Sequence, residues 1–177
     1  MKHVLQVKEL EIKYHTKEGI LTAVRDASFD VNEAEIVGIV GESGSGKSTV
    51  ARMLAAKLGA SFLDTGAMYR VVTLAAIRAG ADLSDQRQLL DVMDESEFKF
   101  SAEQDKMLVF LDGTDVTERL RDRQVTDNAR YIASAPKVRQ KLVGMQRVFA
   151  ATELKIVTEG RDQGTVAFAD ADIKFFL

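Results

Sequence analysis

Eight consecutive residues of this chain have the types and the spacing needed to hold a row of phosphate groups. They run GESGSGKS from Gly41 to Ser48 and match the pattern G-x-x-x-x-G-K-[ST] at every fixed position. Glycines let the backbone turn tightly enough to aim successive N–H groups at phosphate oxygens. In such a loop Lys47 would reach the β- and γ-phosphates as the catalytic cation, and Ser48 would ligate Mg²⁺. The motif therefore predicts binding of a nucleoside triphosphate.

The segments on either side of the loop have the order that this chemistry requires. An apolar, β-branched run, Ile36–Val40, predicts a buried strand before the loop. Val50, Leu54 and Leu58 recur every four residues after it and predict a helix that ends at Gly59. A plain glycine turn between a strand and a helix is the alternative. The predicted nucleotide-binding residues of the loop are Gly41, Gly44, Ser45, Gly46, Lys47, Ser48 and Thr49.

The composition limits the other functions that the chain could have. The length of 177 residues fits one compact domain or a domain with a modest insert, and the 46% hydrophobic and 29% charged residues suit a core with a soluble surface. The net charge of −3 argues against a general nucleic-acid binder. The chain has no cysteine, which excludes disulfides, and no apolar run long enough for a membrane span. We expect a cytoplasmic protein with small-molecule nucleotide partners.

The residues before the loop predict two paired strands. Residues 4–13 alternate apolar and polar side chains, and residues 20–31 repeat the pattern after a Lys-Glu-Gly turn, which predicts an antiparallel hairpin. With the GESGSGKST loop, residues 4–49 resemble the opening of ABC-transporter ATPase subunits of the oligopeptide-import type. This resemblance implies that Tyr14 stacks on adenine; a tyrosine on the sheet face is the alternative reading. The LSGGQ signature, Walker B segment and switch histidine of that family have no counterpart downstream.

From Ser48 to the last residue the chain resembles bacterial cytidylate kinase, a nucleoside monophosphate kinase. The segments DTGAMYR (64–70), VFLDGTDVTERLR (109–121), APKVRQKLVGMQRVFA (135–150) and EGRDQGTV (159–166) carry the likeness. Val40 and Glu42 depart from that family and follow the ABC pattern. The two resemblances overlap inside the loop, which indicates a chimera of an ABC-like leader and a kinase body.

The kinase resemblance implies a site for CMP or dCMP as phosphoryl acceptor beside ATP. A monophosphate carries about two negative charges and is best bound by forked cationic donors. Solvated surface arginines are the alternative reading of these positions. By motif position, the resemblance assigns the acceptor to Thr65, Tyr69, Arg70, Arg139, Arg161 and Asp162.

Strands that alternate with helices predict a three-layer P-loop NTPase fold of the α/β class with a parallel sheet. The leader is expected at residues 1–34 and the kinase-like body at 35–177. Within the body, a small antiparallel substrate-binding insert is expected at about 84–150. Ligands of such folds bind at the carboxyl edge of the sheet.

The family continues past the KFFL strand into an arginine-bearing lid, which the present sequence does not include. We therefore expect impaired transfer, and an apolar edge strand at Ile173–Leu177 that is liable to self-association. A non-catalytic nucleotide-binding scaffold is the alternative function, and an ABC-type ATPase fragment is the least favoured.

Overall fold

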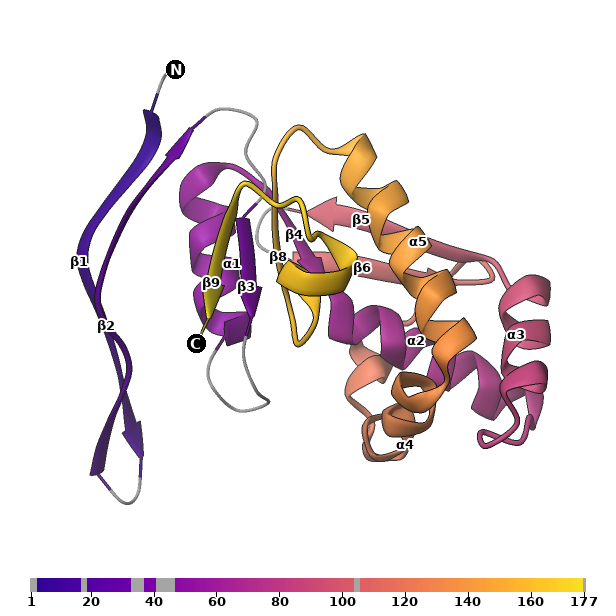
Figure 1. The fold of residues 1–177 in the computed structure, drawn as a ribbon. Coiled ribbons are helices and arrows are strands. Elements are labelled where there is room, and N and C mark those ends of the chain that lie inside the picture. The colour runs from indigo at the N-terminus through magenta and orange to yellow at the C-terminus, as the bar shows by residue number, and fades with distance from the viewer. Residues whose placement is uncertain (1–2, 17–18, 33–36, 41–46, 104–105, 177) are drawn as a thin grey trace.

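A computed structural model describes residues 3–16, 19–32, 37–40, 47–103 and 106–176 of the chain (Figure 1). Its centre is a sheet of four parallel strands in the order β4-β8-β3-β9. The strands are β3 (Val37–Val40), β4 (Ser61–Asp64), β8 (Ile156–Gly160) and β9 (Ile173–Phe176). Every residue of β8 is buried, as expected for an inner strand covered on both faces.

Side chains alternate between the two faces of this sheet. Phe62 and Val157 point to one face and contribute to one core cluster, while Leu63 and Ile156 contribute to the other. On the first face lies α1 (Lys47–Leu58), whose Leu54 side chain is buried in that core. The helix is followed by Gly59 in a left-handed conformation with φ 58°, which fits the predicted glycine terminator.

The second face is covered by the remaining helices and a small sheet (Figure 1). The helices are α2 (Thr65–Ala79), α3 (Gln86–Glu95), α4 (Arg123–Ser134) and α5 (Pro136–Thr152). The antiparallel insert contains β5 (Phe98–Glu103), β6 (Lys106–Leu111) and β7 (Thr114–Asp115). Helices on both faces of a parallel sheet confirm the predicted three-layer α/β fold.

The N-terminal residues form the predicted antiparallel hairpin, β1 (His3–Thr16) and β2 (Gly19–Asn32). In the described part of the chain the two strands pair with each other and form a sheet separate from the central one. The end of β2 joins the core beside α1, where Val31 is 1% exposed. The rings of Phe29 and Phe175 lie 4.2 Å apart, so the hairpin also packs on β9.

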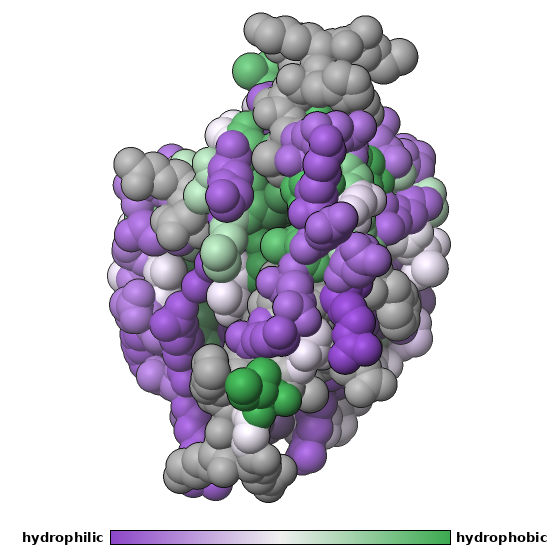
Figure 2. All heavy atoms as spheres, turned by 90° about the vertical axis from the view of Figure 1, so that its left-hand side faces the viewer, coloured by the Kyte–Doolittle hydropathy of each residue, from purple (hydrophilic) through white to green (hydrophobic). Residues whose placement is uncertain are grey.

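The outer part of the hairpin is polar. Figure 2 shows this side of the molecule as largely hydrophilic, with hydrophobic residues visible between the polar ones. Its exposed charged residues are Lys8, Glu9, Glu11, Lys13, Arg25, Asp26 and Asp30.

Strands and helices with clear periodicity were predicted closely. The apolar pattern of the sequence predicts a short strand at Ser61–Asp64 and a helix at Thr65–Gly80. The structure has them as β4 and α2, with Gly80 as the left-handed cap of the helix. The sequence around Arg130 is rich in basic residues and predicts only a cluster of charges, whereas the segment folds as α4. Its few apolar residues, among them the buried Val125 and Ile132, formed too weak a periodic pattern to predict a helix.

The strand expected to be an exposed apolar edge does lie at the end of the sheet, as β9. Its side chains Ile173 and Phe175 are only partly exposed, because they pack on the core that α1 and the hairpin share. Among the described helices, none has the length and apolar character needed to cross a membrane.

Candidate functional site

The site lies where the carboxyl ends of β3, β4 and β8 meet and α1 begins. Residues Gly41, Gly44, Ser45 and Gly46 of the glycine loop lie outside the described residues, as does the side chain of Tyr14. Lys47 and Ser48 open α1 and are partly buried, whereas Thr49 is exposed. The predicted catalytic lysine and magnesium ligand therefore lie at a helix N-terminus, which favours anions.

Glu159, near the end of β8, faces these two residues. Its Oε2 atom lies 3.6 Å from Lys47 Nζ, and its Oε1 atom accepts a hydrogen bond of 3.1 Å from Ser48 Oγ. The sequence interpretation missed Glu159. A signal was present, because Ile156–Glu159 is an apolar strand that ends in a carboxylate, as a Walker B segment does.

The surroundings of Glu159 disfavour its charge. Burial raises the pKa of this carboxyl above its ordinary 4.5, and the nearby Asp64 carboxylate raises it further; Lys47 and Ser48 act in the opposite direction. Among the described residues, Oε2 has no hydrogen-bond partner. A buried carboxylate beside a serine hydroxyl provides hard oxygen donors for Mg²⁺.

The oxygen atoms of Ser48 and Glu159 suit Mg²⁺ that binds together with a nucleotide better than a metal ion held by the protein alone. The described residues contain no group of three or more acidic, histidine or cysteine side chains that could hold a metal ion. Mg²⁺ in such sites typically has one or two protein ligands and takes the rest from phosphates and water. Ser48 and Glu159 supply that number.

A second carboxylate, Asp64, ends β4 and caps α2 by accepting a hydrogen bond of 2.8 Å from the Ala67 N–H. It also lies within ion-pair distance of Arg70, at 3.5 Å, and of Arg52, at 3.6 Å. Arg70 was predicted as an acceptor residue, whereas Asp64 and Arg52 were not singled out. An arginine expected to bind phosphate is therefore already held by a carboxylate in this structure.

The predicted acceptor residues Tyr69, Arg139 and Asp162 come together from three elements. Arg139 Nη2, on α5, donates a hydrogen bond of 3.2 Å to Asp162 Oδ2, in the loop after β8. Burial and the Asp162 carboxylate raise the pKa of Tyr69, on α2, above 10.0, while Arg139 opposes this. A neutral phenol, a guanidinium and a carboxylate can together recognise a polar base or sugar edge.

The other two predicted residues flank the same loop. Thr65 is buried, and its hydroxyl donates a 2.7 Å hydrogen bond to the Glu159 carbonyl, which ties the start of α2 to the end of β8. Arg161 is exposed, two residues beyond Glu159. Gly160 stands between Glu159 and Arg161 in the sequence. Its surroundings are crowded, because an added Cβ would lie 2.8 Å from Thr65 Oγ1.

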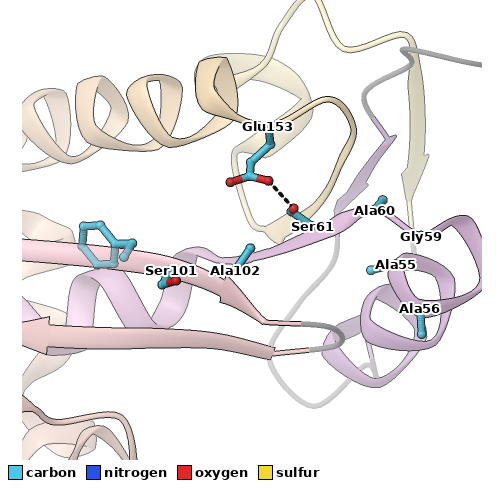
Figure 3. Close-up of a pocket in the computed structure, with 9 residues that line it drawn as sticks. Ala55, Ala56, Gly59, Ala60, Ser61, Ser101, Ala102 and Glu153 are labelled. Atoms are coloured by element: carbon cyan, nitrogen blue, oxygen red, sulfur yellow. Dashed lines mark hydrogen bonds between the residues drawn. The ribbon is translucent and has the colours of Figure 1, made fainter.

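A separate pocket lies at the opposite, amino end of β4 (Figure 3). Small residues of α1 and the insert line it, including Ala55 and Ala102. The polar groups of Ser61 and Glu153 are hydrogen-bonded to each other there. Of the predicted site residues that the structure describes, none lines this pocket.

Comparisons with known proteins point to one family. The sequence profile of the family described as cytidylate kinase matches residues 37–177. The chain is 45% identical over 142 residues to a cytidylate kinase of Rhodococcus opacus and 47% identical over 149 residues to one of Pelotomaculum thermopropionicum. These matches cover 80% and 83% of the chain, but only 62% and 65% of the relatives. The chain thus spans less than two thirds of the length of these curated relatives.

A solved bacterial ABC transporter cassette, described as dimeric, aligns over 97% of this chain and 93% of its own. Its TM-score of 0.42 and identity of 15% are too low to carry an argument. The family profile begins at Val37, after the hairpin. The ABC-like origin of the leader and the chimera therefore remain hypotheses.

Proposed function

Because the chain belongs to the cytidylate kinase family, we propose that it binds ATP with Mg²⁺ and transfers the γ-phosphoryl group to CMP or dCMP. The observation that carries this proposal is the convergence of two sets of charged groups at one edge of the sheet. Lys47, Ser48 and Glu159 suit a triphosphate and its metal ion. Arg70, Arg139 and Asp162 suit an acceptor nucleotide, and the end of β8 joins the two sets.

On the donor side, Lys47 would contact the β- and γ-phosphates, and Ser48 and Glu159 would hold Mg²⁺. The ion would neutralise charge on the phosphate oxygens. Bound cations would also stabilise the ionised form of Glu159, whose pKa is raised by burial and Asp64 in the free protein.

On the acceptor side, Arg70, Arg139 and Arg161 would bind the phosphate of CMP, while Asp162 and Tyr69 would contact the nucleoside. In the free protein Arg70 and Arg139 are paired with Asp64 and Asp162. These ion pairs hold the guanidinium groups in place, and the dianionic phosphate competes for them.

The transfer needs no base. An unprotonated oxygen of the CMP phosphate attacks the γ-phosphorus, the bond to the β–γ bridging oxygen breaks, and ADP leaves with that electron pair. Catalysis then consists of positioning the two phosphates and stabilising their charge. The assembled cations serve both purposes.

The test is product formation from ATP with CMP, dCMP, UMP and AMP in parallel assays. We expect CDP and dCDP, and a large loss in Arg139→Ala but not in Arg87→Ala, whose exposed side chain lies on α3. Binding of ATP and CMP without transfer would favour the nucleotide-binding scaffold instead. ATP hydrolysis unaffected by any monophosphate would contradict an acceptor site.

A further inference from the structure

Asp64 connects the two halves of the site. Its Oδ2 atom lies 3.6 Å from Arg52 Nη2, on the same helix as Lys47 and Ser48. Its Oδ1 atom lies 3.5 Å from Arg70 Nη2, on the acceptor side. One carboxylate, 14% exposed, is therefore shared by two guanidinium groups from α1 and α2.

Both arginines are held by more than this charge. Arg52 also lies over the ring of Phe62, with its Cζ atom 5.3 Å from the ring centroid. Arg70 folds back over the first turn of α2, where a Cβ on Gly66 would lie 3.0 Å from its Nη1 atom. The Nε atoms of both arginines are buried and have no hydrogen-bond partner among the described residues.

The hydrogen-bonding capacity of this cluster is incompletely used. The two ion-pair distances are longer than those of good charged hydrogen bonds, which are about 2.7–2.9 Å. Two cations against one carboxylate leave an excess of positive charge at the site. An anionic oxygen would be attracted to such a cluster, and Arg70 could turn to it while Asp64 keeps Arg52 as its partner.

We propose that Arg52 and Asp64 are positioning residues that control how Arg70 binds the acceptor phosphate. Asp64 holds Arg70 at the site when the acceptor is absent. When the phosphate takes Arg70, Arg52 remains as the counterion of Asp64. This inference rests on the proposed function, because it takes the acceptor to be a nucleoside monophosphate.

The proposal predicts which change weakens phosphate binding. Without Arg52, Asp64 would have Arg70 as its only arginine partner among the described residues and would compete for it against the phosphate. Removing the Asp64 charge as well would end that competition. Asp64→Asn keeps an oxygen for the N-cap of α2, since asparagine caps helices as well as aspartate does.

The experiment is a double-mutant cycle measured by calorimetry with CMP and with cytidine, which lacks the phosphate. We expect Arg52→Gln to weaken CMP binding about 3- to 5-fold, as for a partly exposed ion pair, and to leave cytidine binding unchanged. When Asp64→Asn is already present, Arg52→Gln should change CMP affinity no more than the surface control Arg87→Gln does. Arg52→Lys keeps the charge and should restore part of the loss.

Three results would overturn the inference while the proposed function stands: an unchanged CMP affinity in Arg52→Gln, an equal loss for cytidine, or an equal loss when Asp64→Asn is already present. Thermal unfolding of each variant identifies any that is misfolded, and Arg52→Met, which also removes the charge, then replaces Arg52→Gln in the cycle. Failure of the parent chain to bind CMP would overturn the proposed function, and this inference with it.

Discussion

Lys47 and Glu159 form the charged centre of the proposed donor side. Neither the lysine nor the carboxylate lies in open solvent, since their side chains are 12% and 6% exposed. At such burial each charge depends on the other and on the ligand. The two residues therefore offer the most direct tests of the site.

Removal of the Lys47 ammonium should weaken ATP binding. Lys47→Ala removes a charged hydrogen-bond donor, and we expect a loss of about 1.5–3 kcal/mol in the binding free energy. Calorimetry with Mg-ATP measures it, and Lys57→Ala, an exposed lysine in the last turn of the same helix, is the matched control. Equal affinity in the parent and Lys47→Ala would contradict the assignment of the loop.

Glu159 should make stability depend on pH in a defined direction. Burial and Asp64 raise the pKa of Glu159 above 4.5, so the folded protein favours the protonated carboxyl. Ionisation of Glu159 therefore lowers the free energy of unfolding. The stabilisation from the protonated carboxyl is fully present below pH 4.5 and is lost as the pH rises through the raised pKa. Glu159→Gln does not titrate at this position.

Urea unfolding of the parent and Glu159→Gln over a series of pH values tests this prediction. The free energy of unfolding of the variant, minus that of the parent, should increase as the pH rises above 4.5 and then level off. A difference that decreases with pH would mean that Lys47 outweighs the effect of burial.

At the scale of the elements, the junction between β8 and α2 fixes the site. Gly160 lies where an added Cβ would come within 2.8 Å of Gln163 Cγ and Thr65 Oγ1. Gln163 is buried and accepts a 2.9 Å hydrogen bond from the Thr158 hydroxyl. The close approach of these side chains explains why a residue without a Cβ is needed at the end of β8.

Gly160→Ala should therefore destabilise the fold by about 1–3 kcal/mol, the usual cost of overpacking. Gly144→Ala is the matched control, because Gly144 is on α5 and no atom of the described part of the chain lies within 4 Å of a Cβ there. That control should stabilise the fold by about 0.4–1 kcal/mol. Denaturant unfolding measures both, and equal effects would contradict the crowding at Gly160.

The hairpin gives a prediction about the adenine of ATP. If Tyr14 stacks on the base, as the leader's resemblance implies, Tyr14→Ala should weaken ATP binding by about 0.5–1.5 kcal/mol. Ile20→Ala, on the neighbouring strand and 62% exposed, is the control. Unchanged ATP affinity in Tyr14→Ala would leave the hairpin with a structural role.

At the scale of the whole molecule, two hydrophobic clusters lie on opposite faces of the sheet. The larger one joins α2 to α5 and the insert, and the smaller one joins α1, β9 and the end of the hairpin. The nucleotide loop connects β3 to α1, both of which belong to the smaller cluster. The packing of the hairpin can therefore affect the donor side.

Phe29→Ala tests how the hairpin is attached. It removes the ring contact with Phe175, so amide hydrogen exchange should become faster in β2 and β9 and stay nearly unchanged in α2 and α5. Thr22→Ala, which lies far along β2 from Phe29, is the control. Uniformly faster exchange would mean that the hairpin and the body unfold as one unit.

The amino-acid sequence determined the features that depend on neighbouring residues. The hairpin, β4 and α2 were predicted because their signals are local: alternation of apolar residues, helical periodicity and a glycine terminator. The family was evident for the same reason, since its motifs are short and continuous. Tyr69, Arg139 and Asp162, the residues predicted to bind the acceptor, were named in this way, and the structure places them together.

The tertiary structure alone decided which charges face one another. Glu159 lies 111 residues from Ser48 in the sequence, and Arg52 is separated from Asp64 by the rest of a helix, a turn and a strand. Their contacts exist because β8 inserts between β3 and β4, an order that no local pattern encodes. Burial and charge act through space, so the raised pKa of Glu159 and the carboxylate shared by two arginines depend on the assembled sheet.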